Sequence, residues 1–164
     1  MLLSNRRKLM LGAVVLFTSA CKFTPVYGPD AAGSKLDGRI SVSAPSTREQ
    51  YLLTRRLETR LGRSDPAPMT LTYSVSHSAS GLGTTATGST TRLHRVGALS
   101  YSLKNTSTGE MIDKGRLTNF TGYSATGNTA ASLAAESAAI ERLMYILADQ
   151  LVDRLHLIDP ALLP

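Results

Sequence analysis

The sequence predicts an α+β fold, a two-layer sandwich in which a mainly antiparallel four-stranded sheet packs against two helices in the order β-α-β-β-β-α. Three features indicate this fold. Apolar and polar residues alternate over 69–80, a turn-forming segment at 105–109 joins two further strand-like segments, and an apolar stripe of helical period covers 130–155. We expect one domain over residues 38–164, after a signal peptide at 1–20 and a tether at 21–37.

Length and composition limit the function classes. A chain of 164 residues with 42% apolar residues is long enough for one domain with a modest core. The single cysteine excludes an internal disulfide framework and a thiolate metal cage. Aromatic residues make up only 5% of the chain, which argues against a protein that stacks nucleic-acid bases. We therefore expect no metal and no nucleic-acid partner.

The first 20 residues have the pattern of an export signal. Arg6, Arg7 and Lys8 precede an apolar run at 9–17, and small residues at 18–20 precede Cys21. The run has about half of the ~20 residues that a membrane-spanning helix needs. Removing the signal takes away three of the 18 basic residues and no acidic one, so the net charge falls from +6 to +3. The arginine pair leaves Sec and twin-arginine export as alternatives.

Cys21 has two possible fates. Small residues directly before a cysteine resemble a bacterial lipobox, which predicts a diacylglycerol and an N-acyl chain on Cys21 and no other cofactor. The alternative is ordinary cleavage after Ala20, which leaves a free thiol. Several acyl chains make a stable anchor. Lipoproteins retained in the inner membrane resemble one another in having Asp at the next position, where this chain has Lys22. The expected location is therefore the periplasmic side of the outer membrane.

The first part of the mature chain contains the tether, a strand and a helix. Proline and glycine are frequent between residues 22 and 37, which favours an extended tether. A short alternating strand at 38–43 ends before Pro45, and a capping box, either Ser46 with Glu49 or Thr47 with Gln50, opens a helix to about residue 63. Leucines occupy one face of this helix. Arginines occupy another and are expected to face water or anions: Arg48, Arg55, Arg56, Arg60 and Arg63.

Three strands and a long helix follow. The strand at 69–80 has an all-hydroxyl outer face, and strands at 92–104, with a possible bulge at Gly97, and at 110–121 complete an antiparallel meander. The segment 81–91 is either a long turn or the start of the next strand. The final helix, 130–155, places its apolar stripe on the sheet, and Asp149 and Asp153 are expected on its solvated face.

Catalytic motifs are nearly absent. Residues 81–86 match the dinucleotide pattern GxGxxA, but strand-like sequence follows in place of a helix, which favours a loop. His77, His94 and His156 are scattered and are most simply sheet or surface histidines. No histidine or carboxylate pairs with a plausible nucleophile. The sequence therefore does not predict an enzyme.

The basic residues of the two later strands have two interpretations. If the turn at 105–109 sets the register, Arg95 and Arg116 lie a few residues apart across the hairpin. The basic residues are either ordinary solubilising charge or a patch for phosphorylated lipid headgroups, since guanidinium and ammonium groups bind phosphate. The patch would use Arg92, Arg95, Lys114 and Arg116, with Lys104 nearby.

Residues 21–28, Cys-Lys-Phe-Thr-Pro-Val-Tyr-Gly, resemble the start of the mature lipopolysaccharide-assembly lipoproteins of the LptE family of alphaproteobacteria, usually Cys-Gly-Phe-x-Pro-Leu-Tyr-Gly. Lys22 and Val26 depart from that pattern. The resemblance covers nearly the whole mature chain, through strand, helix and loop segments in the same order: 40–42, 48–57, 98–103, 123–127 and 147–155.

The resemblance implies a lipid-anchored two-layer protein. Members of that family sit as a plug inside the large outer-membrane barrel LptD, assist its assembly and help deliver lipopolysaccharide to the outer leaflet. It implies an LptD-type barrel and lipopolysaccharide as partners, and no catalysis. The alternative function is that of another envelope lipid-binding lipoprotein or a transporter-auxiliary lipoprotein.

Overall fold

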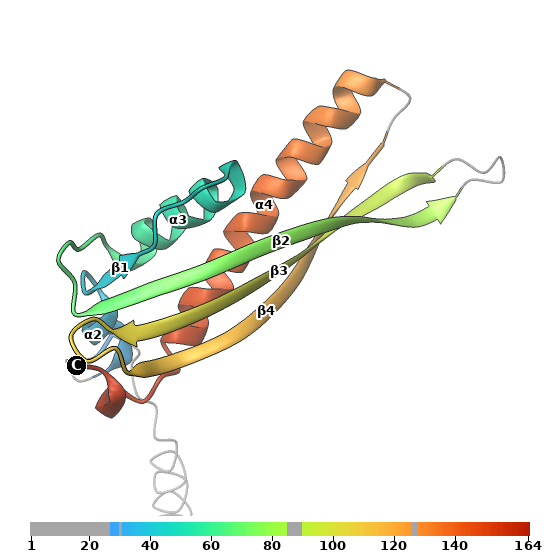
Figure 1. Ribbon diagram of the computed structural model, residues 1–164. Helices are drawn as coiled ribbons and strands as arrows, with labels where there is room; N and C mark the ends of the chain where they lie inside the picture. The colour runs from blue at the N-terminus through green and yellow to red at the C-terminus, as the bar shows by residue number, and fades with distance from the viewer. Residues whose placement is uncertain (1–26, 30, 85–89, 126–127) are drawn as a thin grey trace, which may run out of the picture.

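The computed structural model describes residues 27–29, 31–84, 90–125 and 128–164. Its elements follow one another as α2 (Ala32–Leu36), β1 (Ile40–Val42), α3 (Arg48–Leu61), β2 (Met69–Thr84), β3 (Thr90–Asn105), β4 (Met111–Ser124), α4 (Thr129–Leu155) and a final 3-10 turn, η1 (Pro160–Leu162). The strands form one sheet in the order β1-β2-β3-β4, and α3 and α4 form a second layer on one of its faces (Figure 1). The predicted α+β sandwich is confirmed.

The sheet is mainly antiparallel, as expected. β1 runs parallel to β2 over only three residue pairs, whereas β2, β3 and β4 form a long antiparallel meander. The two outer strands of the meander extend beyond the expected ends, because β2 continues to Thr84 and β4 to Ser124. β3 begins at Thr90, so the segment 81–91 contains strand at both ends, and residues 85–89 lie outside the described part of the chain.

Both main helices begin at side-chain caps. The Thr47 hydroxyl accepts the backbone N–H of Gln50 at 3.2 Å, and the Gln50 side chain accepts the N–H of Ser46 at 2.7 Å. The pairing of Thr47 with Gln50 is therefore the one that opens α3. Asn128 caps α4 by accepting the N–H groups of Ala130 and Ala131.

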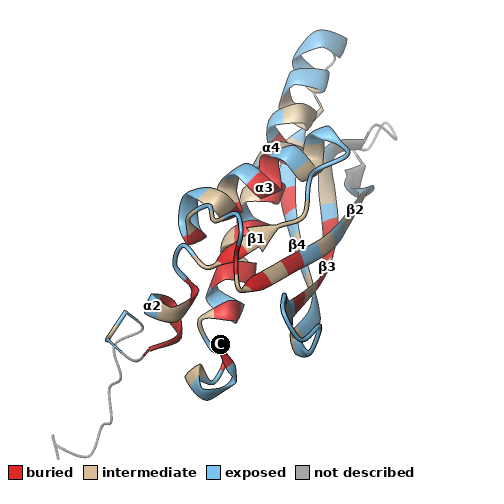
Figure 2. Cartoon of the chain, turned by 60° about the vertical axis from the view of Figure 1, so that its left-hand side comes forward, coloured by how far each residue is buried: buried red, intermediate tan, exposed pale blue. Residues whose placement is uncertain are grey.

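The core lies where α3, α4 and one half of the sheet meet. Figure 2 shows buried residues gathered there, while the first turns of α4 are exposed. Each layer contributes fully buried side chains: Leu53, Leu57 and Leu61 from α3, Met69, Leu71, Leu99 and Leu103 from the strands, and Leu143, Leu147, Leu151 and Leu155 from α4. The other half of the sandwich is thinner, because α3 does not extend over it (Figure 1).

The expected tether up to residue 37 is wrong at its C-terminal end. Residues 32–36 form α2, and Leu36 is fully buried in the core. The Lys35 ammonium donates to the Pro160 carbonyl at 2.8 Å, which ties α2 to the end of the chain. The apolar residues here are too few and too close together to show a helical period. Burying their apolar surface still stabilises the fold. The folded domain therefore starts at α2 and not at residue 38.

Three of the five arginines predicted for the polar face of α3 pair with acidic groups of this chain, whereas Arg48 and Arg60 are exposed, as expected. Arg56 makes a bidentate ion pair with Asp149 of α4, with both N–O distances 2.9 Å. Arg63 pairs with Glu58, and Arg55 lies 3.9 Å from Glu141. Asp149 is therefore only partly solvated, with 35% of its side chain exposed, because the polar faces of the two helices pack side by side, whereas Asp153 is exposed as expected.

Candidate functional site

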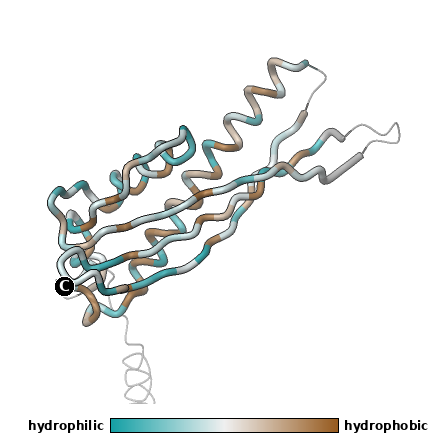
Figure 3. The backbone as a smooth tube through the Cα atoms, viewed as in Figure 1, coloured by the Kyte–Doolittle hydropathy of each residue, from teal (hydrophilic) through white to brown (hydrophobic). Residues whose placement is uncertain are grey.

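The face of the sheet opposite α3 and α4 carries no helix (Figure 1). Alternate side chains of each strand point to it, and Figure 3 shows the alternation as bands of hydrophilic and hydrophobic colour along the strands. We call this surface the open face. On β2 it is lined by hydroxyls, as predicted: Thr70, Thr72, Ser74, Ser76, Ser78 and Ser80. Neighbouring hydroxyls bond across strands, as in the 2.7 Å contact of Thr72 with Ser102.

Three of the four predicted basic residues lie on the open face. The ladder pairs Arg92 with Ser124, Ser102 with Lys114 and Ser100 with Arg116, which places all three cations on the same side as the hydroxyls of β2. Arg92, Lys114 and Arg116 are exposed. Lys104, at the end of β3, is exposed as well. The structure therefore retains most of the predicted patch as an accessible cationic surface.

Arg95 does not belong to that surface. It pairs with Thr121, five residues beyond Arg116 on β4, and an odd spacing puts two side chains on opposite faces of a sheet. Its guanidinium points to the helix layer and forms an ion pair with Glu136 of α4, with side-chain exposures of 16% and 28%. Arg95 and Arg116 do lie a few residues apart across the hairpin, but on opposite faces, so the prediction that they share one patch is wrong. Arg95 links the sheet to α4.

The open face has one sign of charge. Within the described residues, no Asp or Glu occupies an outward position of β2, β3 or β4. Asp113, the acidic residue of β4, points the other way and accepts the hydroxyl of Tyr101 at 2.8 Å. Cations without neighbouring carboxylates produce a positive potential that attracts anionic groups, and both Arg and Lys bind phosphate well. The arrangement therefore suits a phosphorylated or otherwise anionic ligand.

An aromatic cluster lies beside these cations. The rings of His94 and Phe120 stack at 4.9 Å between centroids, with 22° between their planes, and Val96 is directly opposite Phe120. Phe120 is 57% exposed although it is a large apolar side chain. This cluster is not among the residues predicted from the sequence. Counting by twos along β4 from Arg116 would have placed Phe120 on the same face. The open face thus combines hydroxyls, cations and a small apolar platform.

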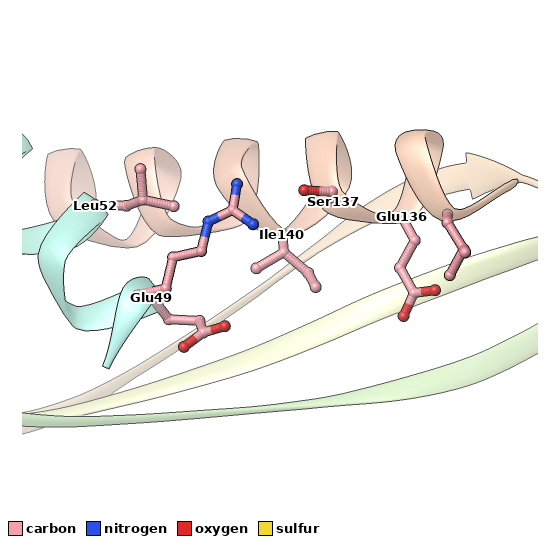
Figure 4. Close-up of a pocket in the computed structure, with 7 residues that line it drawn as sticks. Glu49, Leu52, Glu136, Ser137 and Ile140 are labelled. Atoms are coloured by element: carbon pink, nitrogen blue, oxygen red, sulfur yellow. The ribbon is translucent and has the colours of Figure 1, made fainter. Parts of the chain in front are cut away.

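A cleft of about 230 Å³ lies between α3 and the first half of α4. It is lined by Arg48, Glu49, Leu52, Leu133, Glu136, Ser137 and Ile140. Figure 4 shows Glu49 and Glu136 reaching from the two helices toward the sheet below. The pKa of Glu49 is lowered, chiefly by a hydrogen bond from its own backbone amide and also by the Thr47 hydroxyl and nearby His77. The α3–α4 cleft therefore holds one carboxylate from each helix.

The histidines do not form a catalytic group. His77 and His94 lie on opposite faces of the sheet, and His156 lies at the end of α4, where Tyr27 packs against it edge-on at 5.3 Å. Burial lowers the pKa of His156, and Arg60 adds to the effect while Asp153 opposes it. His77 Nδ1 is buried and has no hydrogen-bond partner among the described residues. Within the described residues, no three His, Cys, Asp or Glu side chains lie close enough together to hold a metal ion.

The dinucleotide-like pattern begins at the end of β2. Gly81 and Gly83 of the dinucleotide-like pattern are paired with β3 as strand, so no helix opens there on a phosphate. Cys21 lies outside the described residues. No helix within the described ranges is long and apolar enough to cross a bilayer.

Comparison with solved structures finds the same fold in bacterial lipoproteins. A candidate lipoprotein from Caulobacter crescentus CB15 superposes with a TM-score of 0.65 at 24% identity, covering 76% of this chain and 92% of that one. The rare lipoprotein B of Shewanella oneidensis superposes with a TM-score of 0.54 at 15% identity, covering 71% and 90%. A minor lipoprotein of Acinetobacter baumannii gives 0.54 at 14% identity, covering 72% and 88%.

Sequence comparison defines the family. No curated protein has a sequence that matches this chain significantly. The family model LptE, described as lipopolysaccharide-assembly, matches residues 38–155, which include every strand of the sheet and both long helices. The chain therefore belongs to the LptE lipopolysaccharide-assembly family.

Proposed function

We propose that this protein is an outer-membrane lipoprotein that forms a plug inside an LptD-type β-barrel and helps lipopolysaccharide reach the outer leaflet. The observation that carries the proposal is the family match over residues 38–155, which spans the sheet with its open face. The role requires binding and the filling of space, and no catalytic step.

The chemistry of the open face supports a position inside a barrel. The lumen of a large outer-membrane barrel is polar, so a plug must present polar groups that can be hydrated or hydrogen-bonded there. Hydroxyl side chains cover β2 on this face, and no described outward residue of the meander is acidic. A sheet uncovered on one side and stiffened by a helix layer on the other offers a broad surface of fixed shape.

The cations of the same face supply the contact for lipopolysaccharide. In the proposal, Arg92, Lys114 and Arg116 bind its phosphates, and the cluster of His94 and Phe120 lies against less polar parts of the molecule. Arg95 takes no part, because Glu136 already neutralises it on the opposite face. This reduces the predicted patch from four residues to three.

The anchor is the lipid on Cys21. Tyr27, the first described residue, is six positions after Cys21, and α2 follows closely. Six residues can span at most roughly 20 Å, so the domain would stay near the periplasmic surface of the membrane until the barrel receives it. Replacing Cys21 with Ser removes the attachment point and leaves every described contact unchanged.

The direct test is recovery of the barrel. Tagged protein would be purified from detergent-solubilised outer membranes, and copurified proteins would be identified by mass spectrometry. We expect an LptD-type barrel in stoichiometric amounts. Recovery of no barrel, or of an inner-membrane complex, would overturn the proposal and favour another envelope lipid-binding lipoprotein. The Cys21→Ser variant should leave the membrane fraction when the barrel is depleted, while wild-type protein stays there.

A further inference from the structure

The two outer edges of the meander differ in how far they are paired. β1 covers β2 only from Met69 to Leu71, so β2 beyond Leu71 has no strand beside it on that edge within the described chain. β4 lies at the other edge of the sheet. Unpaired strand edges present rows of backbone N–H and C=O groups, and these rows can pair with another chain.

The hydrogen bonds of β2 indicate which of its backbone groups point outward. The Met69 N–H donates toward β1, to Arg39, and the Leu71 carbonyl accepts from Ser43 on the same side. The Pro68 carbonyl accepts from Thr106 on the opposite side. Because the direction alternates along a strand, odd-numbered residues face the free edge. The outward groups are the N–H and C=O of Tyr73, Val75, His77 and Ala79.

The edge of β4 is protected, unlike that of β2. The outward N–H of Phe120 donates to its neighbour Asn119 at 2.8 Å, and the carbonyl of Gly122 accepts Arg142 at 3.3 Å. Lys114 and Arg116 add charge to this edge, and a register shift interrupts the ladder near Met111. Charges, irregularities and internal partners are the usual means of keeping an edge strand from pairing.

The edge of β2 has none of these features over residues 72–80. The sequence carries no charged side chain from residue 66 to 91. Its pairing with β3 is regular from Met69 to Gly81. Thr72, Ser74, Ser76 and Ser78 are exposed, and the strand-forming residues Tyr73 and Val75 alternate with them. This edge is therefore ready to accept an added strand.

We propose that the free edge of β2, over residues 73–79, binds an extended segment of the barrel partner as an additional strand. The inference rests on the proposed function for the identity of the partner. Strand addition provides affinity through main-chain hydrogen bonds, and alternate side chains provide specificity. The segment would lie next to β2 in line with β1, on the same edge of the sheet. It must leave that edge before it reaches Val42, the last residue of β1.

The surroundings of the edge define the chemistry of the segment. On the open face its side chains lie beside Ser74, Ser76 and Ser78, which favours small or hydroxyl-bearing residues. On the helix face, β2 meets the first turn of α3 where the Tyr73 hydroxyl donates to the Gln50 carbonyl. The cleft beside that turn is lined by Leu52 and Ile140 and also by Arg48, Glu49 and Glu136, so the residues of the segment on this side can be apolar or polar. The fitting segment carries small or hydroxyl-bearing residues toward the open face.

A second copy of this chain fits the edge less well. If two copies paired antiparallel about a point between Val75 and His77, residue 81 of one copy would lie opposite Leu71 of the other. That position is already occupied, because Val42 of β1 pairs with Leu71. Sliding the copies two residues toward the hairpin tip would avoid the clash by placing residue 83 opposite Tyr73, at the very end of β2. A separate segment with its own backbone course needs no such shift.

Hydrogen exchange of the wild-type protein tests the inference without any variant. Exchange of peptides that span residues 72–80 would be measured by mass spectrometry for the purified protein and for its complex with the barrel. We expect the outward amides of Tyr73, Val75, His77 and Ala79 to exchange at least tenfold more slowly in the complex. The amides of Ser74, Ser76 and Ser78, which face β3, serve as an internal reference because they are protected in both states.

A matched pair of proline variants tests the same edge by binding. Ala79→Pro removes one outward N–H from β2, and Thr118→Pro removes one outward N–H from β4, without removing a bond between strands of the sheet. With melting temperatures checked first, Ala79→Pro should lower recovery of the barrel about tenfold and Thr118→Pro should leave it unchanged.

The outcomes separate this inference from the proposed function. A barrel that copurifies while residues 72–80 exchange as in the free protein would overturn the inference and leave the proposed function standing. If the purified protein has the mass of a dimer and residues 72–80 are protected in it, the edge binds a second copy of this chain. That result would also overturn the inference. If wild-type protein recovers no barrel, both fall.

Discussion

Gly97 of β3 lies directly beneath Leu143 of α4. A Cβ atom built at Gly97 would stand 2.9 Å from Leu143 Cδ2 and 3.0 Å from Leu147 Cδ1, and both leucines are fully buried. Gly97 pairs with His77 and Asn119 without a register shift, so the bulge predicted at this position is wrong. The glycine is there because the helix approaches the sheet closely, which is the other common reason for glycine within a strand.

Adding a side chain at Gly97 should therefore loosen α4. Gly97→Val is expected to lower the free energy of unfolding by about 1 to 3 kcal/mol, the usual cost of overpacking a tight core. Urea denaturation measures this. Ala98→Val, on the neighbouring residue that points to the open face, should change stability by about 0.5 kcal/mol or less. Equal effects of the two variants would contradict the close approach described here.

Charge reversal on the open face should weaken binding of lipopolysaccharide. Lys114→Glu combined with Arg116→Glu removes two phosphate partners and adds repulsion, so we expect about a tenfold loss of affinity at low salt and a weaker dependence on salt concentration. Arg60→Glu, on the exposed surface of α3, changes the net charge by the same amount as Arg116→Glu alone, so these two single variants are compared as the control for charge. If Arg60→Glu weakens binding as much as Arg116→Glu, the effect reflects net charge and the open face is not the site.

The pair of Arg95 and Glu136 should contribute to stability and not to ligand binding. Either Arg95→Met or Glu136→Leu alone leaves a largely buried charge without its partner, which is expected to cost about 1 to 3 kcal/mol, since the pair is not fully buried. The double variant should recover much of that loss, because two apolar groups then meet. Lipopolysaccharide binding by the double variant should match wild type. Reduced binding at equal stability would return Arg95 to the ligand site.

Stability should depend on His156 as the pH falls. Burial of the imidazole, the main cause, lowers the pKa of His156 below its usual value of 6.5. The unfolded chain then takes up the proton more readily than the folded one, so the stabilisation is complete above about pH 6.5 and is lost below it. Unfolding free energies measured from pH 7.5 to 5 should fall more steeply for wild type than for His156→Gln. Parallel curves would show that His156 is not the group responsible.

The elements with strong periodicity could be predicted from the sequence. The alternation of β2 and the apolar stripe of α4 placed both elements within a few residues, because each buries one face along its whole length. The two possible capping pairs likewise placed the start of α3 within one residue, and the structure selects Thr47. In these cases the local pattern and the global fold require the same residues.

Relationships between distant residues could not be predicted in the same way. Whether Arg95 faces solvent or α4 depends on the register of β4 and on where Glu136 lies, and Asp149 meets Arg56 only because two helices pack side by side. α2 has too few residues to show a period, yet it is buried. The position of Phe120 on the open face could have been predicted from the sequence, because alternate residues of a strand point to the same face of the sheet.

Surface display of lipopolysaccharide tests the central claim most directly. Cells depleted of this protein would be complemented with wild-type protein, with the Lys114→Glu and Arg116→Glu double variant, or with the Arg60→Glu control, and lipopolysaccharide would be quantified on intact cells. We predict that depletion removes lipopolysaccharide from the surface, that wild type and the control restore it, and that the double variant does not. Normal surface lipopolysaccharide in depleted cells would contradict a role in its assembly.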